Sequence, residues 1–387
     1  MRHLVACLLL ACVACTGDDG EETFGHESEA GEAGTTDGDE PSYSGEHVVV
    51  YADPGLELCA GTMAHMDDFI ARMAARLAVE VPVVGDRIRM TWVADDQRLA
   101  SYCADADGIL GCADTRVYST QAPLNHEFVH VLSLRRTGTY PTAFFSEGLA
   151  NAHEGYGASP VPTYFYTETD TPITDLIGRK AHDLGGGGYE SAGRFAAYLV
   201  DRHGLARYLD LYVALADAGS DTAAIDAAFL DVLGTGIAAS IDEFSAQPMN
   251  RNYDPLLSEC GAPEIAWDGV TLEMAEMVSC AAPRAVGPYA GSAMLPYTIT
   301  VPADAVYELR LTGDDGEAAV VPDVDIARPF VGVSISTCTP GAGSFAETRV
   351  GGTPRTASLS AGVYSLRLIA TVDAPPTELS FTLQRVE

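Results

Sequence analysis

The amino-acid sequence predicts an α+β fold in which a mixed part of helices and strands precedes an all-β part. Residues 47–252 alternate short β-like runs with longer stretches that carry apolar residues at helical spacing. Residues 255–387 are rich in Gly, Pro, Thr and Val and contain only short alternating runs, as in a sandwich of two sheets. The length of 387 residues also agrees with two domains. We therefore expect one folded domain at 47–252 and a β-sandwich at 255–387.

The N-terminus has the pattern of an export signal, which we expect to span residues 1–15. A short basic start precedes the apolar run Leu4–Ala14, which is too short to cross a bilayer. Cys15 follows small residues and resembles the lipidated cysteine of a bacterial lipoprotein, with Cys12 as the alternative because leucines precede it. An ordinary secretory signal stays open. We expect an outer-membrane or cell-surface lipoprotein, otherwise a periplasmic or secreted protein, with membrane attachment through the N-terminal lipid only.

The distribution of charge predicts a tether and excludes one class of partner. Residues 16–46 contain eleven Asp or Glu and no Lys or Arg, so we expect a disordered acidic tether. Over the whole chain, 22 basic and 55 acidic residues give a net charge of −33. Nucleic acid is excluded as a partner because the chain lacks a basic surface to displace phosphate counterions.

The elements of the first folded part follow from local pattern. The strand His47–Tyr51 precedes a helix over 60–79, in which Met66, Ile70 and Met73 recur at helical spacing. The other elements expected here are strands at 87–93 and 115–119 and helices at 190–203, 205–216, 222–233 and around 241–246. In the second part, the alternating runs at 306–311 and 363–368 resemble each other, and the same pattern returns at 379–383.

Six cysteines remain after the signal, and an even number in an exported chain favours up to three disulfides. Cys103 and Cys112 flank a short Gly/Asp-rich loop and form the simplest pair. The connectivity of the others cannot be deduced from sequence. The six candidates are Cys59, Cys103, Cys112, Cys260, Cys280 and Cys338.

The most informative stretch is His126-Glu127-Phe128-Val129-His130. Residues four apart share one face of a helix, so His126 and His130 would direct two imidazoles at one point, as a zinc ion requires. Glu127 would lie beside the metal, where it could take a proton from a metal-activated water and pass it to a leaving amine.

Two histidines are too few for a catalytic zinc ion, which usually has three protein ligands. The metzincin class needs Gly and His at positions that here hold Ser133 and Arg136, so that class is excluded. A glutamate on the following helix is the other common solution. Glu147, seventeen residues after His130, supplies it, and the segment Arg135–Pro141 provides a turn between the two helices.

With Ser146-Glu147-Gly148-Leu149-Ala150 after the first motif, the chain resembles the gluzincin metallopeptidases, in particular the bacterial peptidase MA-like group. The resemblance extends over Tyr189–Leu199 and Ala227–Gly234. It implies a zincin-like catalytic domain and a zinc-dependent peptidase that acts on a peptide or protein. We expect an endopeptidase, although endo- or exo-specificity is not readable from the sequence. The resemblance further implies one Zn²⁺ bound by His126, His130 and Glu147, with Glu127 as the general base. The strand at 115–119 would then be the sheet edge along which an extended peptide binds.

Some roles remain open at this point. Asn151 stands where the group often has an acidic residue, so it could accept a hydrogen bond from a ligand histidine. For the group that stabilises the oxyanion, Tyr189 is the first candidate. The alternatives to it are His153, Tyr156 and His182. Two interpretations compete with this one. The motif could occur by chance on a core helix, or the protein could be a catalytically silent, zinc-containing module that binds partners at the cell surface.

Overall fold

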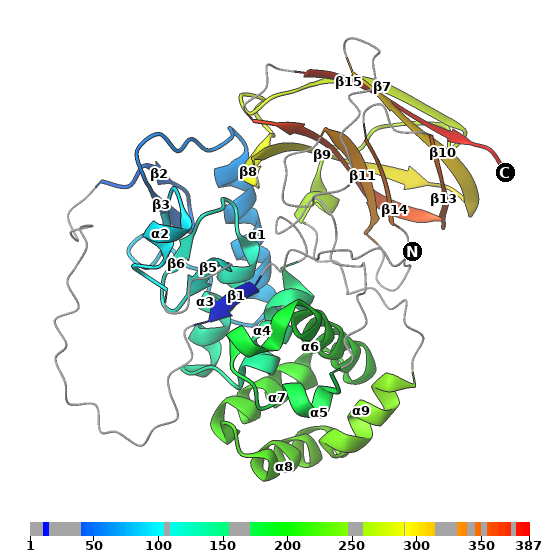
Figure 1. Ribbon diagram of the computed structural model, residues 1–387. Helices are drawn as coiled ribbons and strands as arrows, with labels where there is room; N and C mark the ends of the chain where they lie inside the picture. The colour runs from blue at the N-terminus through cyan, green and yellow to red at the C-terminus, as the bar shows by residue number, and fades with distance from the viewer. Residues whose placement is uncertain are drawn as a thin grey trace, which may run out of the picture.

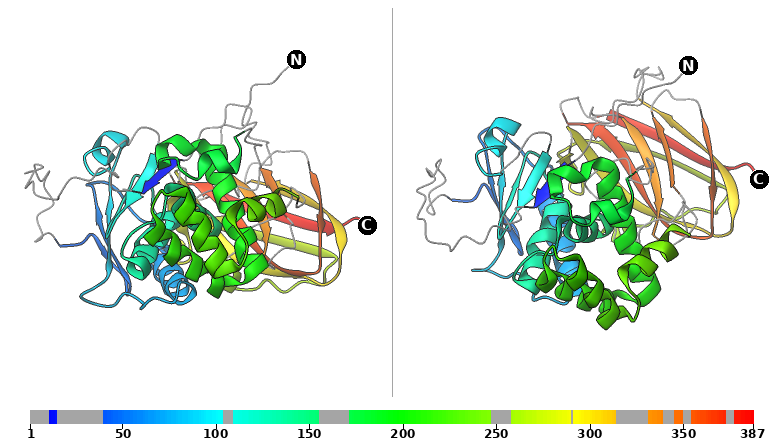
Figure 2. Two further views of the ribbon diagram at one scale, coloured as in Figure 1. Left: turned by 90° about the horizontal axis from the view of Figure 1, so that it is seen from below. Right: turned by 60° about the horizontal axis from the view of Figure 1, so that its bottom comes forward.

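The computed structural model describes residues 11–14, 40–103, 109–154, 171–246, 258–289, 291–313, 331–338, 345–349, 354–372 and 377–387. This part of the chain combines helices with three sheets, as expected of an α+β fold. Figures 1 and 2 show a six-stranded sheet, a group of helices and a pair of C-terminal sheets as three adjoining regions. Its hydrophobic core divides into two large clusters, one within residues 48–233 and the other within 272–383.

The six-stranded sheet is mixed. Its strand order is β1 (Ala11–Ala14), β5 (Ile109–Ala113), β6 (Val117–Ser119), β4 (Ile88–Trp92), β3 (Val48–Ala52) and β2 (Tyr43–Ser44). Strands β3, β4 and β6 are parallel, and β5 is antiparallel to β6. Helix α1 (Thr62–Arg76) connects β3 with β4 and buries Met66, Phe69, Ile70 and Met73, a stripe at the spacing of one helix face.

The helices after the sheet carry the sequence motifs. Helix α3 (Asn125–Thr137) ends at Gly138, whose φ of 76° is left-handed, so the chain can turn into α4 (Ala143–His153). Helix α4 packs closely on α6 (Ala181–His203), where a Cβ at Gly148 would lie 2.7 Å from the carbonyl oxygen of Ala192. The other helices of this part are α2 (Asp96–Leu99), α5 (Ile173–Leu176), α7 (Leu205–Ala218), α8 (Thr222–Leu233) and α9 (Ile237–Ser245).

The C-terminal part consists of two sheets around one core cluster, which we call the β-sandwich. One sheet has the order β13 (Arg355–Leu359), β10 (Ala305–Thr312), β15 (Thr377–Arg385) and β7 (Thr271–Val278). The other has the order β12 (Phe345–Arg349), β11 (Gly332–Thr337), β14 (Gly362–Thr371), β9 (Ser292–Val301) and β8 (Val286–Tyr289). The short helix η1 (Ser258–Gly261) precedes these strands. Tyr307 and Tyr364 are among the largest fully buried side chains of the β-sandwich, as the alternation around them predicts.

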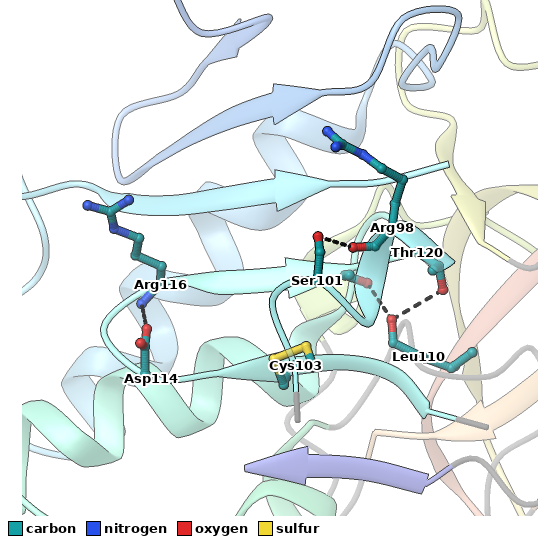
Figure 3. The surroundings of a disulfide bond; sticks show 9 residues. Arg98, Ser101, Cys103, Leu110, Asp114, Arg116 and Thr120 are labelled. Atoms are coloured by element: carbon teal, nitrogen blue, oxygen red, sulfur yellow. Dashed lines mark hydrogen bonds between the residues drawn. A yellow bond between two sulfur atoms is a disulfide. The ribbon is translucent and has the colours of Figure 1, made fainter. Parts of the chain in front are cut away.

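Three disulfides are present, as expected for an oxidising compartment. Cys103 joins Cys112 and ties the loop after α2 to strand β5 (Figure 3). The other two bonds, Cys59–Cys280 and Cys260–Cys338, connect segments 221 and 78 residues apart. Cys59–Cys280 links the segment before α1 to the β-sandwich.

The sheet corrects three expectations. The segment Ala11–Ala14, expected to lie outside the fold, is strand β1 and pairs with the outer edge of β5. Residues 117–119 lie between β4 and β5, so the expected edge strand is internal. Ordered structure begins before His47, because Tyr43 pairs with Val50.

Other expectations concern residues that the structure does not describe. Cys15, most of the acidic segment and the boundary near 252–255 lie outside the described residues, whereas Cys12 lies on β1. Among the described helices, none is by itself long and apolar enough to cross a membrane; α8 and α9 meet that test only as a pair bent by 74°.

Candidate metal centre

Helices α3 and α4 bring the three predicted ligands together. His126 and His130 lie one turn apart on α3, and Glu147 lies on α4. Their exposed fractions are 1%, 0% and 0%. The distances are 3.1 Å between the two Nε2 atoms, 3.0 Å from His126 Nε2 to Glu147 Oε2, and 3.3 Å from His130 Nε2 to the same oxygen. This closed triangle of donor atoms could bind a metal ion.

The electrostatics of the triangle fit a site that holds positive charge. Burial alone would lower the pKa of His126, but hydrogen bonds to Glu147 and Glu154, with the charges of Glu154 and Glu127, raise it well above 6.5. Burial opposes ionisation of Glu147 as well, yet the charge of His130 and hydrogen bonds from both histidines lower its pKa to about 2. The groups that favour the charged form of His126 would also favour a cation at this position.

Glu154 makes a contact that the sequence analysis missed. Nδ1 of His126 donates a hydrogen bond of 2.9 Å to Oε2 of Glu154, which is 9% exposed. This bond fixes the proton on Nδ1 and leaves Nε2 of a neutral ring with a lone pair for a metal. The available signal was spacing, because Glu154 follows Glu147 by seven residues, two turns along the same helix face.

Asn151, expected in that role, is directed elsewhere. Its Nδ2 donates a hydrogen bond of 2.8 Å to the backbone carbonyl of Tyr189 on α6. The carboxylate on His126 therefore comes from the end of α4 rather than from its middle. The physical reason is that Asn151 lies on the face of α4 that packs on α6.

Glu127 lies between the ligand histidines and strand β5. Its side chain is fully buried, and its charge acts on His126. A Cβ at Gly111 of β5 would lie 3.3 Å from Cγ of Glu127 and 2.7 Å from the carbonyl oxygen of Tyr118. Glycine at position 111 therefore lets β5 run directly past the carboxylate.

Tyr140 is a second neighbour that the sequence analysis missed. It lies between α3 and α4, and its ring meets that of His130 edge-on with 5.8 Å between centroids. Among the described residues, its buried hydroxyl has no hydrogen-bond partner. Burial, the neighbouring Tyr212, and the charges that include Glu127 and Glu147 raise its pKa, so the phenol stays neutral. The sequence predicts only a turn at Arg135–Pro141; its first three residues belong to α3, and Tyr140 lies in the connection that follows.

The residues that the sequence offers for stabilising the oxyanion have other surroundings or lie outside the described residues. Tyr189 is 3% exposed and belongs to the large core cluster. His153 Nδ1 lies 3.0 Å from the carbonyl oxygen of Leu149 within its own helix. Tyr156 and the side chain of His182 lie outside the described residues. The role of Tyr189 stays a prediction.

Comparison with known proteins adds no assignment. Neither the models of protein families nor the curated proteins give a match to this sequence. The buried His₂Glu group and the residues around it are therefore the features that bear on function.

Proposed function

We propose that the protein is an exported zinc-dependent endopeptidase with a zincin-like catalytic region. The observation that carries the proposal is the closed triangle formed by His126, His130 and Glu147, with Glu127 beside it. Ligand bonds of about 2.0–2.2 Å around a tetrahedral zinc ion place two ligand atoms about 3.3–3.6 Å apart. The observed separations of 3.0–3.3 Å are close to this value and would open slightly around an ion.

The donor set supports zinc over other common cations. Two imidazole nitrogens and one carboxylate oxygen form the His₂Glu set of catalytic zinc sites, whereas calcium and magnesium prefer oxygen ligands only. Three protein ligands leave a fourth position open, which is the mark of a catalytic rather than a structural site. Bound zinc would supply Lewis acidity to the substrate carbonyl and lower the pKa of water.

Glu127 is the general base in this proposal. Its carboxylate accepts a proton from the attacking water and donates it to the leaving amine as the peptide bond breaks. Helix α3 holds the carboxylate in a fixed position, because its neighbours on the helix are buried on both sides. A site that only bound a metal ion would not need a carboxylate at position 127.

For the group that stabilises the oxyanion, we propose Tyr140 beside the earlier candidate Tyr189. The neutral hydroxyl of Tyr140 has a proton to donate and no other hydrogen-bond partner among the described residues. We propose that it donates to the carbonyl oxygen of the scissile bond as negative charge develops there. The ring of His130 positions it from one side.

The outer edge of β5 is the proposed binding strand for substrate. It passes Glu127 at Gly111, and it accommodates an extended segment, Ala11–Ala14. That segment belongs to the predicted signal, so its removal would leave the edge open for a substrate strand. The proposal thus moves the binding strand from 115–119 to 109–113.

Export agrees with the three disulfides, which suit an oxidising compartment. We propose lipidation at Cys15, with Cys12 as the alternative, and attachment to a membrane through that lipid. The hydroxyl, carboxylate and metal chemistry above requires no other cofactor.

The test uses the mature chain and its Glu127→Gln variant, with Glu57→Gln as the control, because Glu57 is exposed. We expect one zinc ion per chain in all three proteins. Chelator-sensitive cleavage of a peptide library should occur with wild type and Glu57→Gln and be lost with Glu127→Gln. Retained cleavage by Glu127→Gln overturns the role of the base. Zinc binding without cleavage by the wild type would favour the silent binding module.

A further inference from the structure

The N-terminus of helix α3, which carries His126 and His130, is buried against the β-sandwich. Leu124, the residue directly before α3, is fully buried in a small cluster with Tyr289, Met294 and Ile369. These three come from strands β8, β9 and β14, more than 160 residues later in the chain. The cluster is separate from both large cores. The residue directly before α3 is therefore in contact with the β-sandwich.

Backbone contacts fix the same junction. The amide of Ala122 donates a hydrogen bond of 3.4 Å to the carbonyl of Pro288, just before α3. At the start of α1, the hydroxyl of Thr62 donates to the carbonyl of Gly287 at 2.6 Å and accepts from the amide of Gly287 at 3.0 Å. The disulfide Cys59–Cys280 joins the same two segments, since Cys59 lies shortly before Thr62 and Cys280 shortly before Gly287. Figure 1 shows β8 next to α1 at this junction.

A line of polar groups runs from the sandwich to a ligand histidine. Arg367 on β14 is 2% exposed, and its charge acts on the buried ring of His65. His65 Nε2 lies 3.4 Å from Nδ2 of Asn125, which also donates to the backbone carbonyl of Glu154 at 3.5 Å. The Glu154 carboxylate in turn accepts from Nδ1 of His126. Both the backbone and the side chain of Glu154 are therefore positioned next to the first ligand.

We infer that the β-sandwich is a structural part of the metal centre and positions His126 through Leu124, Asn125 and Glu154. The inference rests on metal binding by His126, His130 and Glu147, as proposed above. Leu124, Asn125 and Ile369 are positioning residues, since none of them lies among the ligands. A sandwich that merely accompanied the first part would leave the ligand geometry independent of its packing.

The test is the metal affinity of matched sandwich variants. Ile369→Ala and Ile335→Ala each remove the same side chain from a fully buried position on neighbouring strands of one sheet. Ile369 contacts Leu124 through the small cluster, whereas Ile335 belongs to the sandwich core. Zinc affinity is measured by competition with a chelator on the full mature chain, and thermal unfolding is recorded in parallel. The Co²⁺-substituted protein reports ligand geometry through its visible absorption bands.

We expect Ile369→Ala to weaken zinc binding about ten-fold, the size typical of losing an outer-shell support, and to shift the Co²⁺ bands. Ile335→Ala should lower thermal stability to a similar extent while affinity and bands stay those of the wild type. Equal affinities in the two variants would overturn the inference. If Ile369→Ala does not fold, Ile369→Val and Ile335→Val replace the pair. A wild-type chain that binds no zinc contradicts the proposed function instead.

Discussion

Nδ1 of His126 and Oε2 of Glu154 lie 2.9 Å apart, and this hydrogen bond joins the first predicted ligand, on α3, to the end of α4. It orients the ring so that Nε2 faces His130 and Glu147. Glu154→Ala should therefore lower metal affinity about 10–100-fold. Asn151→Ala is the comparison, since Asn151 donates to the Tyr189 carbonyl. Chelator competition measures both, and a larger loss in Asn151→Ala would return the supporting role to that residue.

Tyr140→Phe removes one hydroxyl and keeps the ring against His130. Because the hydroxyl is proposed to act only as charge develops on the substrate, kcat should fall by about 10²-fold while KM and zinc content stay unchanged. Steady-state kinetics on a cleaved peptide checks this. Tyr189→Phe serves as the control with expected near-normal kcat, and the reverse ranking would restore Tyr189 as the oxyanion residue.

Gly148→Ala tests the contact of α4 with α6. The added Cβ would meet the carbonyl oxygen of Ala192 at 2.7 Å, so the helices must separate. We expect a loss of about 1–3 kcal/mol in the free energy of unfolding, as for an overpacked core. Denaturant unfolding gives this value. Gly178→Ala has nothing within 4 Å of its new Cβ and should be nearly neutral; similar losses in both would argue against the close approach.

His65 gives the fold a defined sensitivity to acid. Burial lowers its pKa to about 4, and the charge of Arg367 acts in the same direction, against Asp68 and the hydrogen bond to Asn125. Between pH 6.5 and 4 the unfolded chain binds the proton more readily than the folded one, so stability is lost as pH falls through that window. The loss amounts to as much as about 3 kcal/mol.

Unfolding of His65→Gln measured over the same pH range checks this prediction. The variant has no imidazole to protonate, so its stability should fall less steeply between pH 6.5 and 4 than that of the wild type. Parallel curves for the two proteins would show that other groups dominate the acid response.

Local signals explain why some elements could be predicted closely from sequence. Helix α8 was expected at Thr222–Leu233 and lies there, because both ends are determined locally. The side chain of Asp221 accepts hydrogen bonds from the amides of Ala223 and Ala224, and Gly234 takes the left-handed conformation that ends the helix. The same holds for the spacing that brings His126 and His130 onto one face of α3.

Elements without a clear local pattern could not be predicted. Strand β5 has the sequence Ile-Leu-Gly-Cys-Ala, a weak β pattern, and is defined by its pairing with β6 and by the Cys103–Cys112 disulfide. Glu154 and Tyr140 reach the site through the packing of α3 against α4, which the local sequence pattern does not show. That His126, His130 and Glu147 converge was expected, and their binding of zinc stays a prediction.

The junction before α3 has a consequence for the order in which the chain can fold. Cys59 can form its disulfide only after Cys280, 221 residues later, has been made, and Leu124 can pack against Ile369 only when that residue, near the end of the chain, is present. Translation delivers these segments last. A chain whose last strands have not yet been made therefore lacks the contacts that pack Leu124, directly before α3, against the β-sandwich.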